Sequence, residues 1–154
     1  MLDAVLFDLD GTLADTAPDL CGTVNILLSE EGRPQQPFSR LRPHTSGGVR
    51  GLLGEGFGIE PADPDYARLA ARFLEIYAGR LCELSTLFDG IPALLDTLES
   101  CGIAWGIVTN KRARFTDPLV EALGLGRRTL CVVSGDTTVE AKPSPLPILH
   151  ACAL

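Results

Sequence analysis

Two aspartates, Asp8 and Asp10, directly follow a short apolar run, and their spacing suits chemistry. The run Val5-Leu6-Phe7 has no polar alternation, which is typical of a strand buried on both faces of a parallel sheet. Residues at i and i+2 of an extended chain project to the same side, so the two carboxylates should converge beyond the strand's carboxyl end. Ligands of open α/β sheets bind at that edge. Because like charges repel and only oxygen ligands are in view, the sequence predicts a Mg²⁺ site at Asp8 and Asp10.

The segment Asp8-Leu9-Asp10-Gly11-Thr12 also resembles the first motif of the haloacid dehalogenase-like (HAD) phosphatases. In that family the first Asp is the nucleophile and the second is the general acid/base, so the resemblance implies these roles for Asp8 and Asp10. Gly11 and Thr12 complete the motif and are expected to bind substrate. Taken alone, the five residues also fit an ordinary strand followed by an Asp-Gly turn.

Two later segments carry a hydroxyl and an amine that suit the same sheet edge. Thr109 and Asn110 close a second apolar run and can donate hydrogen bonds to a phosphoryl oxygen, although helix capping is the alternative. Lys142 precedes a proline that restricts its backbone, and its ammonium can neutralise carboxylates and phosphate; a solvated surface lysine is the alternative. Two segments resemble the second and third HAD motifs, namely Val108-Thr109-Asn110-Lys111 and Lys142-Pro143-Ser144-Pro145. This resemblance implies that Thr109 and Lys142 hold the transferring phosphoryl group.

The resemblance implies a magnesium-dependent phosphomonoesterase that acts on a small cytoplasmic metabolite. Asp8 would form an aspartyl-phosphate, while Asp10 would protonate the leaving alcohol and then activate water. Mg²⁺ held by Asp8 and by the backbone carbonyl of Asp10 would offset phosphoryl charge. Two alternatives stay open, namely a phosphomutase of the same superfamily and an inactive phosphate-binding module.

Within the family, the chain most resembles the phosphoglycolate phosphatase-like branch. Three segments look particularly like the N-acetylmuramic acid 6-phosphate phosphatases of bacterial cell-wall recycling: Ser46-Gly47-Gly48, Leu87-Phe88-Asp89-Gly90 and the run from Trp105 to Lys111. This resemblance implies phosphoglycolate or a sugar phosphate as substrate.

The pattern of apolar residues predicts an α/β, parallel core from residues 1–14 and 85–154, with a helical insert at 15–84 after the first strand. The family resemblance implies that the core is Rossmann-like and that the insert is a helical cap over the site. Within the cap, Gly48 and Arg50 could offer a backbone amide and a guanidinium to an anionic substrate. An Arg50 that is simply solvated is at least as good an interpretation.

The cap is predicted in more detail as a loop from Pro37 to Pro43, a short helix through Leu53, and a long helix from Asp63-Pro64 to about Cys82. In the core, residues 103–108 are predicted to form a second buried strand and residues 130–133 a third. Gly135-Asp136 is interpreted as loop.

Composition restricts the class of partner. A net charge of −7 over 154 residues gives no basic surface for nucleic acid or an anionic membrane, so neither is expected as a partner. No apolar run approaches the roughly 20 residues of a membrane span, and nothing resembles a signal peptide. Five cysteines without Cys-x-x-Cys spacing indicate thiols in a reducing cytoplasm.

The family's fourth motif, an acidic strand end that completes the Mg²⁺ site, is not found before Leu154. We therefore expect an incomplete core in which Val5 to Asp8 forms an apolar sheet edge open to self-association. The expected consequence is weak Mg²⁺ binding and poor turnover by the chain alone. Full magnesium-dependent turnover by a monomer would refute this expectation.

Overall fold

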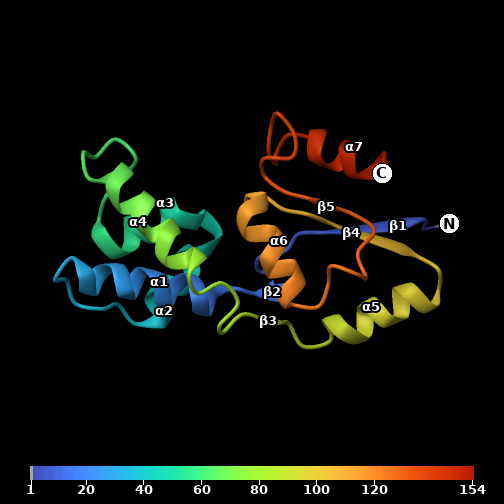
Figure 1. The fold of residues 1–154 in the computed structure, drawn as a ribbon, viewed down its shortest axis with the longest axis horizontal. Helices are drawn as coiled ribbons and strands as arrows, with labels where there is room; N and C mark the ends of the chain where they lie inside the picture. The colour runs from blue at the N-terminus through green and yellow to red at the C-terminus, as the bar shows by residue number, and fades with distance from the viewer. Residues whose placement is uncertain (1) are drawn as a thin grey trace. The chain divides into compact units, whose positions relative to one another are not determined.

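A computed structural model describes residues 2–154, and it divides the chain into two compact units (Figure 1). The first unit contains the residues up to Asp15 together with Thr86–Leu154, and the second contains Thr16–Ser85. Each unit is described by itself.

The first unit is built on a three-stranded parallel sheet with the order β1-β4-β5. The strands are β1 (Ala4–Phe7), β4 (Ala104–Val108) and β5 (Val132–Val133). The predicted α/β fold class with a parallel sheet is thereby confirmed. The last paired residues are Phe7 with Ile107 and Val108 with Val133, so all three strands end at one edge.

The expected burial of the first strand on both faces is only partly found. Val5, Leu6 and Phe7 of β1 are half-buried, whereas the four residues Trp105–Val108 of β4 are buried. The reason is position in the sheet, because β1 pairs with β4 alone and β4 lies between two strands.

Helices cover the two faces of this sheet. On one face the indole of Trp105 packs edge-on against Phe7 and donates a hydrogen bond to Glu99 of α5 (Ile91–Ser100) at 3.0 Å. On the other face α7 (Leu146–Cys152) contacts β4 and β5 (Figure 1). Its Ala151 belongs to a buried apolar cluster with Val108, Cys131 and Val133. The crossover from β4 to β5 contains α6 (Ala113–Ala122), which includes Pro118.

Two short strands that the sequence did not reveal lie where the chain leaves and re-enters the first unit. They are β2 (Ala14–Asp15) and β3 (Thr86–Leu87), which pair antiparallel. Strands of two residues are too short to show a period-two pattern, so this pairing had no readable signal.

The second unit is helical throughout its regular elements. These are α1 (Ala17–Glu30), α2 (Phe38–Leu41), η1 (Arg42–Gly47), α3 (Gly48–Phe57) and α4 (Tyr66–Ala78). The apolar sides of α1, α3 and α4 meet in the buried core of this unit, which includes Val24, Leu53 and Phe73.

Three predicted boundaries in this unit are wrong. The predicted loop from Pro37 to Pro43 is instead α2 and the beginning of η1, because the proline at position 43 stands in the first turn of η1, where a missing N–H costs nothing. The helix predicted to pass through Leu53 continues to Phe57 and ends at a left-handed glycine. The predicted helix to Cys82 stops at Ala78, and Cys82 has a φ of 61°, which a helix does not accommodate.

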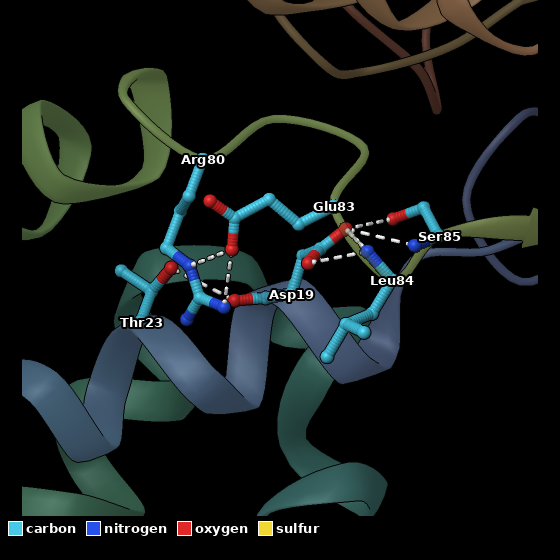
Figure 2. A network of polar contacts seen from close by, with 6 residues as sticks. All are labelled: Asp19, Thr23, Arg80, Glu83, Leu84 and Ser85. Carbon is cyan, nitrogen blue, oxygen red and sulfur yellow. Dashed lines mark hydrogen bonds and ion pairs between the residues drawn. The ribbon is translucent and has the colours of Figure 1, made fainter.

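A buried carboxylate ties the two ends of the second unit together (Figure 2). Asp19, in the first turn of α1, is fully buried. Its Oδ2 accepts hydrogen bonds from the backbone N–H of Ser85 at 2.9 Å and from the Ser85 hydroxyl at 2.6 Å. The backbone N–H of Leu84 donates to the same carboxylate at 3.0 Å. Since α1 lies at the beginning of the unit and Ser85 is its last residue, the Asp19 carboxylate joins the two ends of the unit by hydrogen bonds.

Candidate active site

Asp8 directly follows β1, and its side chain is 45% exposed. The backbone N–H of Leu9 donates to Asp8 Oδ1 at 2.8 Å, which fixes the orientation of the carboxylate. The chain then turns tightly, with the N–H groups of Leu13 and Ala14 both donating to the Leu9 carbonyl. Gly11 has a φ of 75° in this turn, a conformation that favours glycine. The turn therefore presents Asp8 and Asp10 at one edge of the sheet.

The ammonium of Lys142 reaches the first carboxylate. Its Nζ lies 3.2 Å from Asp8 Oδ2 and donates a hydrogen bond of 2.6 Å to the backbone carbonyl of Val108. Val108 is the last residue of β4, the neighbour of β1. The two oxygens of Asp8 thus face different donors, one from its own turn and one from a loop far along the chain.

A second lysine, which the sequence analysis did not single out, faces the second carboxylate. Lys111 Nζ lies 2.9 Å from Asp10 Oδ1, and the Lys111 side chain is only 9% exposed. Lys111 and Lys142 are the only lysines in the sequence, beside eleven arginines. That scarcity, together with the position of Lys111 two residues after Thr109, was a signal that could have identified it.

Thr109, the first residue after β4, is held by hydrogen bonds with β5 and with the loop that follows β4. Thr109 is buried, its N–H donates to the Val133 carbonyl at 2.9 Å, and its hydroxyl accepts a hydrogen bond from the N–H of Lys111 at 3.1 Å. The carboxamide of Asn110 is bonded to the backbone of Lys142. The substrate contacts expected of Thr109, Asn110, Gly11 and Thr12 stay predictions.

The loop after β5 packs on the loop after β4. Gly135 lies so close to the backbone carbonyl of Asn110 that a Cβ would collide with it, and its N–H donates to the Lys111 carbonyl at 2.8 Å. Asp136 Oδ1 accepts a hydrogen bond from the N–H of Ala113, at the beginning of α6. Gly135-Asp136 is therefore part of a loop, and it supports the segment that carries Thr109 to Lys111.

The structure thus joins Asp8 with Lys142 and Asp10 with Lys111 in the first unit. The other two predicted site residues, Gly48 and Arg50, belong to the second unit, where Gly48 begins α3. Arg50 Nη2 pairs with Glu60 at 2.9 Å, and both side chains are mostly exposed. Exposed pairs of this kind contribute little to stability. The substrate contacts expected of Gly48 and Arg50 stay predictions.

Arg50 lines an open cleft of about 480 Å³ in the second unit. The lining comes from α3 and the segments on either side of it, and it includes His44, Glu55 and Glu60. The hydrogen bond from Arg40 lowers the pKa of Glu55 below its usual value, so this carboxylate stays ionised. The cleft therefore has charges of both signs.

Asp8 and Asp10 are the residues that could hold a divalent cation. Among residues 2–154 no group of three or more His, Cys, Asp or Glu side chains is arranged to bind a metal. Mg²⁺ does not need one, since it is commonly bound by one or two carboxylates with water and substrate phosphate as the remaining ligands. The half-exposed Asp8 and the partly exposed Asp10, two residues further along the chain, fit that donor set.

Two carboxylates, each paired with a lysine, at the ends of parallel strands fit the chemistry of phosphoryl transfer. The model of the haloacid dehalogenase-like hydrolase family matches residues 5–154. The chain belongs to this family, and the predicted resemblance to HAD phosphatases is confirmed.

Named relatives are phosphatases. The chain is 40% identical over 152 residues to the N-acetylmuramic acid 6-phosphate phosphatase of Pseudomonas aeruginosa, covering 99% of this chain and 67% of that protein. It is 45% identical over 148 residues to the phosphoglycolate phosphatase of Xanthomonas campestris pv. campestris, covering 96% of this chain and 66% of that protein. The chain therefore spans about two thirds of the length of these relatives.

The fold agrees with solved structures of the family. The crystal structure of a predicted phosphoglycolate phosphatase from Haemophilus somnus superposes with a TM-score of 0.83 at 25% identity, covering 99% of this chain and 71% of that one. A HAD-superfamily hydrolase from Geobacter sulfurreducens gives a TM-score of 0.78 at 22% identity, over 99% and 71% of the two chains, and this likeness concerns the fold alone. Within residues 2–154, no helix combines the length and the apolar character needed to cross a membrane.

Proposed function

We propose that this chain carries the catalytic centre of a magnesium-dependent phosphatase for a small phosphomonoester, either phosphoglycolate or a sugar phosphate such as N-acetylmuramic acid 6-phosphate. The observation that carries the proposal is the fixed orientation of Asp8. One of its oxygens accepts the Leu9 N–H, and the other faces the ammonium of Lys142. A carboxylate held in this way is prepared for in-line attack on phosphorus.

In the first half of the proposed reaction, an Asp8 oxygen forms a bond to phosphorus and the ester P–O bond breaks. Asp10 gives its proton to the departing alcohol oxygen, so the alcohol leaves neutral and Asp8 carries the phosphoryl group. Lys142 offsets the negative charge on the transferring group. Lys111 Nζ, 2.9 Å from Asp10 Oδ1, restrains the side chain of this proposed acid/base.

In the second half, Asp10 takes a proton from water, and the water oxygen attacks the phosphorus of the aspartyl-phosphate. The acyl P–O bond breaks, so Asp8 regains its carboxylate and inorganic phosphate is released. Mg²⁺ bound at Asp8 and Asp10 would supply charge compensation on the phosphoryl oxygens. The buried Thr109 hydroxyl and the Thr12 and Gly11 turn are the proposed further contacts to the phosphoryl group.

Release of inorganic phosphate from phosphoglycolate, N-acetylmuramic acid 6-phosphate and glucose 6-phosphate tests this function. We expect release from one of the first two substrates with Mg²⁺ and none in EDTA or with the Asp8→Asn variant. Transfer of the phosphoryl group to a sugar hydroxyl without phosphate release would indicate a mutase instead. A stable beryllofluoride adduct without any turnover would indicate a phosphate-binding module. Either result would refute the proposal.

A further inference from the structure

The carboxamide of Asn110 is paired with the backbone of Lys142, thirty-two residues further along the chain. Its Nδ2 donates to the Lys142 carbonyl at 2.9 Å, and the Lys142 N–H donates to its Oδ1 at 2.9 Å. The side chain therefore bonds both polar groups of one residue, as the backbone of a neighbouring strand does in a sheet. This pair fixes where the Lys142 side chain begins.

The same short segment also fixes where that side chain ends. The ammonium of Lys142 donates to the carbonyl of Val108, two residues before Asn110, and lies 3.2 Å from Asp8. A lysine has a flexible four-carbon stem, so its charge is positioned only if its backbone and its ammonium are both held. Val108 at the end of β4 holds the ammonium, and Asn110 in the loop that follows β4 holds the backbone.

We propose that Asn110 is a positioning residue of the phosphatase reaction, which holds the Lys142 backbone so that the Lys142 ammonium stays at Asp8. This inference rests on the proposed function. It assigns Asn110 a role through Lys142 and not through contact with the substrate. Loss of the carboxamide is expected to displace the ammonium while the fold stays intact.

A role in stability alone is a weaker account of this pair. Asn110 is exposed, and water can replace its hydrogen bonds when the side chain is removed. The chain also offers a matched control in Asn25 of the second unit. Asn25 makes the same reciprocal pair with the backbone of Gln36, at 2.9 Å and 2.8 Å, and neither residue is placed in the catalytic machinery.

The first experiment needs no activity. Because the sequence contains only two lysines, biosynthetic labelling with ¹³Cε-lysine gives two lysine signals, which Lys111→Arg assigns. Asn110→Ala is expected to shift the Lys142 signal and to speed hydrogen exchange of the Lys142 amide. Asn25→Ala is expected to change neither. If Asn110→Ala leaves both the signal and the exchange rate unchanged, the proposal is overturned.

The second experiment measures kinetics on the best substrate. For Asn110→Ala we expect kcat to fall on the order of 10²-fold with KM changed by less than about threefold, because misplacing a catalytic group acts mainly on the reacting complex. Asn110→Asp, which keeps an acceptor for the Lys142 N–H, should lose less. The thermal midpoint of both variants should stay within about 3 °C of the parent, as for an exposed substitution.

Two results separate this inference from the proposed function. A raised KM with unchanged kcat in Asn110→Ala would overturn the positioning role and favour direct substrate contact. If the parent chain releases no phosphate from any substrate, the proposed function fails, and the lysine signals still decide whether Asn110 positions Lys142.

Discussion

The two units of the chain use aspartate in opposite ways. Asp19 of the second unit is fully buried, and uncharged donors of Leu84 and Ser85 satisfy its carboxylate. Asp8 and Asp10 of the first unit are partly exposed and face Lys142 and Lys111. The buried carboxylate of Asp19 is saturated by uncharged donors, although these lie 65 and 66 residues further along the chain. The carboxylates of Asp8 and Asp10, to which we assign the chemistry, keep an open side toward solvent and face ammonium groups.

The largest effect should follow from Asp8→Asn. We expect phosphate release to fall by roughly 10³-fold or more, because an amide is not a nucleophile at this position. Stability should change little, since the Asp8 side chain is 45% exposed. Kinetics and urea denaturation measured on the same preparation test the expected loss of activity and the expected retention of stability. Unfolding at markedly lower urea would contradict the distinction drawn between Asp8 and Asp19.

Asp19→Ala should show the reverse behaviour. Removing the carboxylate leaves the buried N–H and hydroxyl of Ser85 and the partly buried N–H of Leu84 without an acceptor, and we expect a loss of about 3 kcal/mol of unfolding free energy. Far-UV circular dichroism in urea measures it. The exposed Asp65→Ala of the same unit is the control and should change stability by less than about 0.5 kcal/mol. Equal effects of the two substitutions would mean that the buried carboxylate stabilises nothing.

Lys111 allows a test of what positions Asp10. Lys111→Met removes the ammonium that lies 2.9 Å from Asp10, and we expect kcat to fall about tenfold because the side chain of the proposed general acid is no longer held in place. Lys111→Arg keeps the charge and should retain more of the activity. Steady-state kinetics of both variants measure the difference. If Met and Arg behave alike, the charge of Lys111 has no part in the reaction.

The smallest expected effect concerns Glu99, a carboxylate of the first unit with a structural role. The hydrogen bond from Arg128, with a second from Trp105, lowers the pKa of Glu99 below its usual value of 4.5. A carboxyl group whose pKa is lower in the folded state stabilises the fold above about pH 4.5, and this contribution is lost as the pH falls through the folded-state value.

We therefore expect Glu99→Gln to lose less stability than the parent chain when the pH is lowered from 7 to 4. The fluorescence of Trp105, the only tryptophan, reports unfolding of the first unit in urea at each pH. The same pH dependence in both proteins would show that other groups account for the acid sensitivity.

Much of the candidate site could be predicted from local signals. The spacing of Asp8 and Asp10 after an apolar run, and the polar residues after β4, place these groups at one edge of a parallel sheet wherever such a sheet forms. Lys142 was identified by its resemblance to a family motif. Lys111 was missed although its position two residues after Thr109 was a signal, and its pairing with Asp10, 101 residues earlier, is not linked by any sequence pattern.

The limits of the secondary-structure prediction have physical causes. Pro37 and Pro43 indicated a loop, yet Pro37 is the N-cap of α2, and Pro43 stands in the first turn of η1, where a proline is well accommodated. The pairing of β2 with β3 involves two residues on each strand. Two residues are too few to predict a strand, so this pairing depends on the folded chain bringing the two segments together.

The sequence by itself determined the class of the protein, because a strand followed by Asp-Leu-Asp-Gly-Thr, a Thr-Asn-Lys segment and a Lys-Pro loop encode their chemistry in side-chain type and short spacing. The tertiary structure decided which partner each group receives. Lys142 pairs with Asp8, Lys111 pairs with Asp10, and Asn110 bonds the Lys142 backbone. These contacts join residues between 32 and 134 positions apart, a separation at which hydrogen bonds depend on the folded path of the chain and not on local preference.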